Sequence, residues 1–541
     1  MSKLQRMGVL GVRVLGAGVA LSVLSLAANC GSTKTDDAPP GDTGGGTDTA
    51  PGDGGGTDAN KDAGGDVIKP PGDSAVPDLP STLIAEGSFT PLQFNGMTTD
   101  DHFIAIDDAG NAVAIPVAGG APIKITDSAA TTNVRVEGKT VLVWKGVNKT
   151  TSVGTLIAWT KANGAKTLTT ASILGEASAS DDGTLVAYAD NARSAGKVFD
   201  YSISKTDGTG VQKAVITNVM EDATKCAPQT GFAGTKAVVA WCLSDVGGDA
   251  GVDAGLDVGL DGGDAGGPTA IPAKVSSIDG SGAVVTLKSD AVPSFRASKD
   301  GTKISVLTNA GAFSVITLGG AETPIATGVT FGDLLPEGNT VVYVDSTKAF
   351  FKATVGAAPA PVKLADGVVV FYNPVPGATH VFYGTKNDTK NNLSDLFMVS
   401  LAGGTATTLS AAVTATFFGD SFSADGSLVL FYSGVAAGIG NLQWVDKAAP
   451  AAPKTIAPGV WVSYSPKGTQ VVYNDAYSPG AGSESGTADL KLILDAKAGG
   501  PKLIATQADA DFYMTTARDK IVYSTADASV KKPGLYSVAV P

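Results

Sequence analysis

The stretch Ser180–Tyr188, SDDGTLVAY, recurs with small changes along this chain. Close copies are SADGSLVLFY at Ser423–Tyr432 and SPKGTQVVY at Ser465–Tyr473, and looser copies are SKDGTKISVL at Ser298–Leu307 and PEGNTVVYV at Pro336–Val344. Each copy has a turn at Asp–Gly or its equivalent, then polar residues, then an apolar run. A phrase that returns every few tens of residues indicates an architecture of small stacked modules.

The turn glycine, or an Asp in its place, marks ten repeat units. The markers lie near Asp101, Gly138, Gly183, Gly234, Gly301, Gly338, Gly377, Gly426, Gly468 and Asp519. Successive markers are 37 to 51 residues apart, except for 67 residues between Gly234 and Gly301. The long gap contains an Asp/Gly tract at residues 245–268, whose removal leaves 43 residues. We therefore expect the tract to be an insertion in a loop of one unit.

A second, glycine-rich phrase alternates with the first. It reads VAGGAPIKI at Val117–Ile125, LGGAETPI at Leu318–Ile325, LAGGTATTL at Leu401–Leu409 and KAGGPKLI at Lys497–Ile504. Asp–Gly and Gly–Gly supply the positive φ angles of tight hairpins. The apolar runs, such as Val471–Tyr473, are continuous, which is typical of strands buried on both faces. Units of about 40 residues with four strands each are typical of propeller blades.

These phrases resemble the WD40-like repeats of TolB-type propellers and of the propeller domains of prolyl oligopeptidase relatives. The resemblance covers most of residues 82–541 and implies an all-β fold, a β-propeller of four-stranded blades. Because ten units exceed the usual number of about four to eight blades, we expect about eight blades, within a range of about seven to ten, or two rings. The stretch Ser81–Leu92 is similar to Lys502–Tyr513, and we expect this N-terminal strand to complete the last blade and remove exposed edges.

The first 29 residues have the layout of a secretory signal, with three basic residues before an apolar stretch of about fifteen residues. That stretch is short for a membrane span. The run Leu26–Cys30, LAANC, resembles the lipobox of bacterial lipoproteins, which implies that Cys30 is acylated. Asn29 and Ala27 depart from the family's pattern, so an ordinary cleaved signal is the alternative.

Residues 30–80 are rich in Gly, Asp, Thr and Pro and contain no aromatic residue. Such a composition cannot build a core, so we expect a disordered tether between a membrane anchor and a propeller at residues 81–541. Gly31, rather than Asp, follows the cysteine. In the lipoprotein sorting rule this implies the outer membrane of a Gram-negative bacterium, with the propeller facing the periplasm or the cell surface.

The net charge of −13 is concentrated in two low-complexity tracts. Residues 31–80 hold ten Asp and three Lys, and Asp245–Asp264 holds six Asp and no basic residue. The remainder is close to neutral and shows no basic face. Nucleic acid is therefore excluded as an expected partner.

Catalytic motifs are not found in the sequence. A zinc site or a Ser-His-Asp triad is built around histidine, and the chain has two histidines, His102 and His380, which we interpret as structural. There is no G-x-S-x-G nucleophile elbow. We expect no catalytic residue, no metal and no cofactor.

The two cysteines that follow the tether, Cys226 and Cys242, predict a disulfide. They are an even pair in a domain that we expect to be exported, and an oxidising compartment favours pairing. The two thiols are not arranged as C-x-x-C, so we expect a structural bridge rather than a redox site.

The inserted Asp/Gly tract contains weak calcium candidates, because carboxylates in glycine-rich turns bind hard cations. The candidates are Asp249, Asp253, Asp257 and Asp261. Their spacing of four does not fit the nine-residue calcium repeat. The composition of the tract also matches that of the N-terminal tether, so a disordered loop is the interpretation that we favour.

Three functions fit this sequence. The first is a lipid-anchored envelope propeller that acts as a non-catalytic scaffold and binds a protein or a glycan through its loops. The second is an envelope enzyme of lyase or glycosidase type, with a carboxylate site in the propeller channel. The third is a purely structural envelope lipoprotein. The sequence points to no particular pair of channel carboxylates, so the first function is the one we expect.

Overall fold

The computed structural model describes residues 77–541 except for 93–95, 194–196, 222–225, 244–272, 357–360, 373–378, 387–394, 412–414, 418, 437, 451, 479–485 and 526–531. The described residues belong to one compact unit. They form strands and turns, with one short 3-10 turn, η1 (Thr131–Asn133), and no α-helix among them. No helix in the described ranges is therefore long and apolar enough to cross a membrane.

The strands are short and follow one another through tight turns. The first twenty are β1 (Thr82–Glu86), β2 (Phe89–Pro91), β3 (His102–Asp107), β4 (Ala112–Pro116), β5 (Ile123–Thr126), β6 (Val134–Glu137), β7 (Thr140–Lys145), β8 (Val153–Thr160), β9 (Gly164–Ile173), β10 (Ala177–Ala179), β11 (Leu185–Arg193), β12 (Val198–Lys205), β13 (Gln212–Met220), β14 (Gln229–Ala233), β15 (Lys236–Leu243), β16 (Ala273–Ile278), β17 (Val284–Ala297), β18 (Lys303–Thr308), β19 (Phe313–Thr317) and β20 (Glu322–Ala326). The others are β21 (Val329–Leu334), β22 (Thr340–Asp345), β23 (Phe350–Thr354), β24 (Val362–Ala365), β25 (Val370–Tyr372), β26 (His380–Gly384), β27 (Leu396–Ser400), β28 (Thr407–Ser410), β29 (Ala415–Thr416), β30 (Leu428–Ala436), β31 (Ile439–Asp446), β32 (Lys454–Val460), β33 (Ser463–Tyr464), β34 (Val471–Ser478), β35 (Thr487–Ile493), β36 (Pro501–Asp509), β37 (Phe512–Met514), β38 (Lys520–Thr525) and β39 (Gly534–Ala539).

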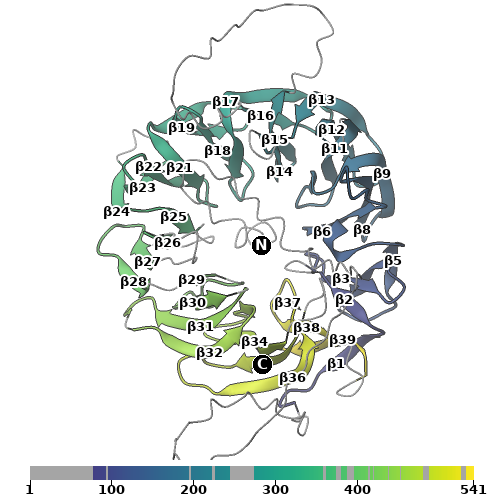
Figure 1. Cartoon of the computed structure of the whole chain (residues 1–541), viewed down its shortest axis with the longest axis vertical. Helices are drawn as coiled ribbons and strands as arrows, with labels where there is room; N and C mark the ends of the chain where they lie inside the picture. The colour runs from purple at the N-terminus through teal and green to yellow at the C-terminus, as the bar shows by residue number, and fades with distance from the viewer. Residues whose placement is uncertain are drawn as a thin grey trace, which may run out of the picture. The chain divides into compact units, whose positions relative to one another are not determined.

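Strand pairing divides the described strands into ten four-stranded antiparallel units, which we number as blades. Blade 1 is β2–β5, blade 2 is β6–β9, blade 3 is β10–β13, blade 4 is β14–β17, blade 5 is β17–β20, blade 6 is β21–β24, blade 7 is β25–β28, blade 8 is β29–β32, blade 9 is β33–β36, and blade 10 is β37, β38, β39 and β1. In Figure 1 the blades follow one another around a ring, and several of the first strands lie toward the middle: β6, β14, β21, β29 and β37. The chain is a β-propeller.

The number of blades is higher than the eight that we expected and lies at the top of the range. The described ranges contain one blade for each of the ten turn markers, in a single ring. Each marker lies at or near the turn between the first two strands of its blade, except Gly377, which is outside the described residues. The repeat count was therefore a better guide to the blade number than the usual size of propellers.

The repeated phrase builds its turn by local hydrogen bonds. In blade 3, the Ser180 hydroxyl donates to the Asp182 carboxylate at 2.5 Å and accepts from the backbone N–H groups of Thr184 and Leu185 at 3.2 and 3.0 Å. Asp182 in turn accepts from the Thr184 backbone at 3.0 Å. Gly183 has a φ of +76°, the left-handed conformation that glycine adopts without steric cost. The Ser, Asp and Gly of the phrase are thus all used in making the turn.

Some of the turn glycines also lie where neighbouring blades touch. A Cβ atom on Gly138 would lie 2.8 Å from the Asp181 carbonyl oxygen of the next blade, and one on Gly301 would lie 2.0 Å from the Gly234 backbone nitrogen of the previous blade. The Thr99 backbone N–H donates across a similar junction to the Gly138 carbonyl at 2.9 Å. At these junctions the turns of neighbouring blades therefore contact one another along one face of the ring, which we call the turn face.

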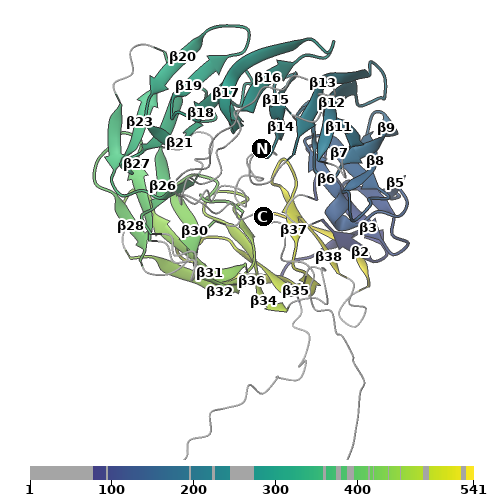
Figure 2. The ribbon, with the colours of Figure 1, turned by 45° about the horizontal axis from the view of Figure 1, so that its top comes forward.

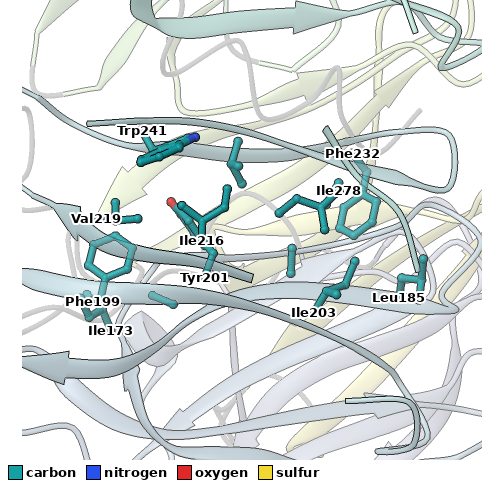
Figure 3. Packing of buried hydrophobic residues seen from close by; sticks show 14 residues of the cluster. Ile173, Leu185, Phe199, Tyr201, Ile203, Ile216, Val219, Phe232, Trp241 and Ile278 are labelled. Atoms are coloured by element: carbon teal, nitrogen blue, oxygen red, sulfur yellow. The ribbon is translucent and has the colours of Figure 1, made fainter. Parts of the chain in front are cut away.

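Apolar side chains fill the spaces between blades. Along β11 the run is buried on both faces: Leu185 and Ala187 pack in the cluster between blades 3 and 4, and Val186 and Tyr188 pack in the cluster between blades 2 and 3. Figure 3 shows the first cluster, where Tyr201 extends from β12 toward the side chains of blade 4. Because each strand has two buried faces, its sequence is continuously apolar, as predicted.

Blades 3, 4 and 5 are joined into one sheet of eleven strands. The long strand β17 pairs with β16 over its first half, up to Ala291, and with β18 over its second half. It is thus the outer strand of blade 4 and the inner strand of blade 5. The Asp/Gly tract lies between the paired strands β15 and β16, outside the described residues, so it is an insertion within blade 4.

The ring is closed by the N-terminal strand. β1 pairs antiparallel with β39, with Thr82 opposite Ser537 and Glu86 opposite Gly534, and completes blade 10. The chain then enters blade 1 directly through β2, which lies beside β38 in both views (Figure 1, Figure 2). The predicted closing strand is confirmed for its first half, whereas its second half begins blade 1. Because β1 completes blade 10, neither the first blade nor the last is left incomplete where the ring closes.

Candidate functional site

A hollow of about 1060 Å³ lies on the turn face over blades 1 to 4. Its lining comes from the turns between the first and second strands and between the third and fourth strands of these blades. The charged residues that line it are Asp100, Lys139, Lys161, Asp182, Lys205, Asp207, Lys236 and Asp279. Four carboxylates and four ammonium groups are therefore held on one surface.

The carboxylates of the hollow are fixed by the turns that carry them. Thr209 donates to Asp207 from both its backbone N–H, at 2.8 Å, and its hydroxyl, at 2.6 Å, and these bonds lower the pKa of Asp207. Ser281 makes the same two bonds to Asp279, at 2.9 and 2.6 Å, and lowers its pKa. For Asp182, burial raises the pKa, but the bonds from Ser180 and Thr184 outweigh it and the pKa is lowered. These groups stay ionised at neutral pH.

Unlike the carboxylates, the lysines of the hollow are not held in place by hydrogen bonds from their own turns in the part of the chain that the structure describes. Lys139, Lys161 and Lys205 are exposed and Lys236 is half-buried. Within the described ranges, no hydrogen bond or ion pair engages the amino groups of these four residues. The hollow therefore combines fixed acceptors with long, adaptable donors, a combination that suits a polar ligand carrying both hydroxyl or amide groups and anionic groups.

A second polar cluster lies between blades 3 and 4, at the ends of the strands remote from the hollow. Glu176 directly precedes β10, and Glu221 directly follows β13. The Tyr201 hydroxyl donates to Glu176 Oε2 at 3.3 Å and accepts from the Thr230 hydroxyl at 2.9 Å. Burial and the charge of Glu221 raise the pKa of Glu176 to about 7, against a smaller opposite effect of Arg135. Burial also raises the pKa of Glu221.

The sequence predictions did not find Glu176 or Glu221. They are 45 residues apart, one repeat length, and both lie in connections between blades. A search for acidic residues that recur at the repeat interval outside the turn phrase could have found the pair. A pair of channel carboxylates was considered from the sequence, but no residues were assigned to it.

Of the predicted cysteine sites, the disulfide lies within the described residues and the lipidation site does not. Cys226 and Cys242 form a disulfide with Cα atoms 6.3 Å apart, at the end of β15 in blade 4. The lipidation candidate Cys30 lies outside the described residues, so its acylation stays a prediction.

The calcium candidates of the inserted tract also lie outside the described residues. They are Asp249, Asp253, Asp257 and Asp261. In the ranges that are described, no group of three or more His, Cys, Asp or Glu side chains has the geometry of a metal site. The weak calcium prediction and the disordered-loop interpretation of this tract therefore both stay predictions.

The two histidines lie in blade strands. His102 is buried, its Nδ1 lies 3.1 Å from the Asp100 carbonyl oxygen and 3.3 Å from the Asp100 carboxylate, and its ring packs edge-on against Trp159. His380 begins β26, and its Nδ1 lies 2.9 Å from the Thr379 hydroxyl. Burial lowers the pKa of His380. Both contacts are of the structural kind that we expected.

No protein-family model matches this sequence, and no curated protein matches it. Solved structures similar to it include the tricorn protease, which is 9% identical over 85% of this chain with a TM-score of 0.28, and the chain spans 53% of that protein. A protein described as TolB from Agrobacterium tumefaciens is 14% identical, with 48% of this chain and 94% of that one covered and a TM-score of 0.23. The C-terminal WD40 domain of Sif2 is 11% identical, with 68% and 95% covered and a TM-score of 0.33.

The resemblance to TolB-type and WD40-like propellers holds for the repeated unit. It extends to no site, because each of these proteins is less than 15% identical to this chain. The strand pairing itself, with ten four-stranded blades and a closing strand β1, defines the fold of this chain.

Proposed function

We propose that this chain is an outer-membrane lipoprotein, anchored through Cys30, whose propeller is a non-catalytic scaffold that binds an envelope protein or glycan in the hollow of the turn face. The observation that carries the proposal is the hollow of about 1060 Å³, which is close to the upper end of the sizes of ligand sites. It is built on short turns of a closed ring, which hold their side chains in place.

The charges of the hollow support a polar partner. The carboxylates of Asp182, Asp207 and Asp279 are already bonded to their own turns, so a ligand need not pay for ordering them. The lysines provide contacts that can adapt to the ligand. Both hydroxyl-rich glycans and charged protein surfaces have groups that complement such a lining.

A photocrosslinking amino acid at Lys161 tests the binding site in intact cells. Lys161 is exposed in the hollow, and Lys467 is a matched control, because it is exposed in a turn of blade 9 away from the hollow. We expect one dominant protein or glycan adduct from position 161 and none from position 467, identified by mass spectrometry. Equal adducts at both positions, or none at either, would contradict binding in the hollow and favour a purely structural role.

The substitution Cys30→Ala tests the anchor separately. If Cys30 carries the lipid, the variant moves from the membrane fraction to the soluble exported fraction. The readout is fractionation of cells with and without the substitution, with metabolic labelling by a fatty acid. If the fractionation and labelling of the variant are unchanged, Cys30 does not carry the lipid. The proposal that the hollow binds a ligand is not affected by that result.

An enzyme with a carboxylate site is the second candidate, and the pair Glu176 and Glu221 favours it. A carboxyl group whose pKa is raised to about 7, in part by the charge of a second carboxyl, is a combination that acid–base catalysts use. Incubation of the protein with acidic and neutral polysaccharides, followed by a reducing-end assay, tests this. If the wild type cleaves a polysaccharide and Glu176→Gln does not, the enzyme proposal replaces the scaffold proposal. If neither protein is active, the scaffold proposal stands.

A further inference from the structure

We infer that Glu176, at the end of the hydrogen-bonded chain that joins blades 3 and 4, makes this junction sensitive to pH. The inference does not depend on the ligand of the hollow, because Glu176 and Glu221 lie at the other ends of the strands. It concerns instead how firmly two neighbouring blades are held together.

The geometry connects three consecutive blades through Glu176. Its carboxylate accepts from Tyr201 of blade 3, whose hydroxyl accepts from Thr230 of blade 4. Because the Tyr201 hydroxyl has a single proton, which it donates to Glu176, and receives that of Thr230, the bonds form a directed chain. The Arg135 Nη1 of blade 2 donates to the carbonyl oxygens of Gly175 and Ala177, both at 2.9 Å, and so holds the backbone on either side of Glu176.

Three titratable or charged groups act on Glu176, and their balance disfavours its negative charge. Glu221 repels the charge, and it comes from the connection that follows β13. Arg135 attracts it, but less strongly than Glu221 and burial oppose it. Tyr201 stabilises it through its hydrogen bond, although Tyr201 itself stays neutral, because burial raises its pKa well above the usual value. Two acidic groups that repel each other in this way do not both ionise without cost.

The direction of the pH effect follows from the raised pKa. Glu176 has a pKa of about 7 in the folded protein and an ordinary value near 4.5 when exposed. Between these values the folded state holds a proton that the unfolded state has released. The stability from this proton is therefore complete below about pH 4.5 and is lost as the pH rises through about 7. The junction is tighter in mildly acidic than in mildly alkaline solution.

Thermal unfolding of the full chain between pH 5 and pH 8.5 tests the inference, with Glu176→Gln as the main variant. Glutamine keeps the shape of the protonated carboxyl and cannot titrate. We expect the melting temperature of the wild type to fall by several degrees over this range and that of the variant to fall less than half as far. Glu322→Gln is the matched control: Glu322 pairs with Lys288 at 2.8 Å, and its pKa is lowered, so it titrates outside the range. Parallel curves for the wild type and Glu176→Gln would overturn the inference.

Hydrogen exchange of the wild type gives a second test that needs no variant. After correction for intrinsic rates, peptides that cover β10 and β14 should lose protection as the pH rises from about 4.5 and should level off above about pH 7, whereas peptides that cover β22 and β23 of blade 6 should show no such change. The same profile in both regions, or no loss of protection in either, would refute a local proton site. Glu221→Gln should move the pH at which protection levels off to a lower value, because it removes the repelling charge, and an unmoved value would contradict the role of Glu221.

Discussion

Blades 3 to 5 and blades 8 to 10 are built from the same repeat but are joined by different means. In the first region the strand pairing crosses the blade boundaries, through the shared strand β17 and the contact of β13 with β15. In the second region each blade is a separate four-stranded sheet. Backbone contacts join blades 8 and 9, among them an isolated bridge between Gly419 and Ser463 and a hydrogen bond from the Asp425 N–H to the Gly468 carbonyl oxygen at 3.3 Å. Side chains make further connections in this region. The repeat specifies the blade, and its variations decide how blades are joined.

The side-chain junction of blades 8 to 10 centres on one ion pair. Arg518, in the first turn of blade 10, donates to both carboxylate oxygens of Asp420, at 2.5 and 3.0 Å, and to the carbonyl oxygen of Ser465 in blade 9 at 2.6 Å. The Ser465 backbone N–H donates to the same carboxylate at 2.8 Å. Opposite charges thus meet at this junction, whereas the charge of Glu221 repels that of Glu176 at the junction of blades 3 and 4. A compensated junction should not respond to pH near neutrality, and an uncompensated one should.

The largest expected effect comes from Gly301→Ala, which breaks the backbone contact of blades 4 and 5. A Cβ atom at residue 301 would lie 2.0 Å from the Gly234 nitrogen, so the two turns must move apart. The left-handed φ of +70° adds about 1–2 kcal/mol of strain, and overpacking adds about 1–3 kcal/mol. We expect a loss of about 2–5 kcal/mol in the free energy of unfolding, measured in urea.

Gly468→Ala is the matched control for that substitution. Gly468 occupies the corresponding turn of blade 9 with a φ of +53°, and nothing lies within 4 Å of its Cβ position. It should show the conformational strain alone, about 1–2 kcal/mol. An equal loss from both variants would mean that the turn contact between blades 4 and 5 contributes nothing.

Arg518→Ala should give the next largest effect, through the second region. It leaves the Asp420 carboxylate, of which 17% is exposed, without its cation. Removing one partner of a buried pair costs about 3–5 kcal/mol, and partial exposure here reduces the expectation to about 2–4 kcal/mol. Lys363→Ala is the control, because Lys363 and Asp366 are both more than half exposed, and it should cost less than about 1 kcal/mol. The double variant Arg518→Ala with Asp420→Ala should recover part of the loss, and no recovery would show that the ion pair is not the cause.

The sequence predicted the blades well and the junctions poorly, for a physical reason. A turn phrase is local: Ser180, Asp182 and Gly183 bond within five residues of one another, so their spacing alone reveals the turn. A junction is not local. Arg518 meets Asp420 across 98 residues, and the contact of Tyr201 with Thr230, 29 residues away, depends on how blades 3 and 4 stack. The shared role of β17 was also hidden, because its sequence has no turn between the halves.

Removing the disulfide should affect the first region alone. Cys226 and Cys242 pack with Ala273 and Met220, where blades 3 and 4 meet, and they close a loop of 16 residues in sequence separation. The variant with both cysteines replaced by alanine should lose about 2–3 kcal/mol on the chain-entropy estimate. In hydrogen exchange, the loss should appear in peptides of β14 and β15 and not in those of β34 and β35. Equal deprotection of both sets would mean that the two regions unfold as one unit, and the contrast between them would be structural but not energetic.

The smallest expected effect should be the same in both regions, because it arises within a blade. Ser298 of blade 5 and Ser423 of blade 8 donate to Asp300 and Asp425 at 2.5 and 2.6 Å and accept from a backbone N–H at 3.0 and 2.9 Å. Each Ser→Ala substitution should cost about 1 kcal/mol at pH 7, measured in urea.

The pH dependence of this pair is a further check, opposite in sign to that of Glu176. The bond from Ser298 is the largest of the causes that lower the pKa of Asp300. For Asp425, burial raises the pKa, but the bonds from Ser423 and Ser427 outweigh it and the pKa is lowered. A lowered carboxyl pKa gives stability that is present above about pH 4 and is lost as the pH falls through the folded value. The difference in the free energy of unfolding between the wild type and each variant should therefore become smaller in acid. If Ser298→Ala and Ser423→Ala lose different amounts of this free energy, the contacts between blades must influence the turns within them. The blades could then not be treated as independent of their neighbours.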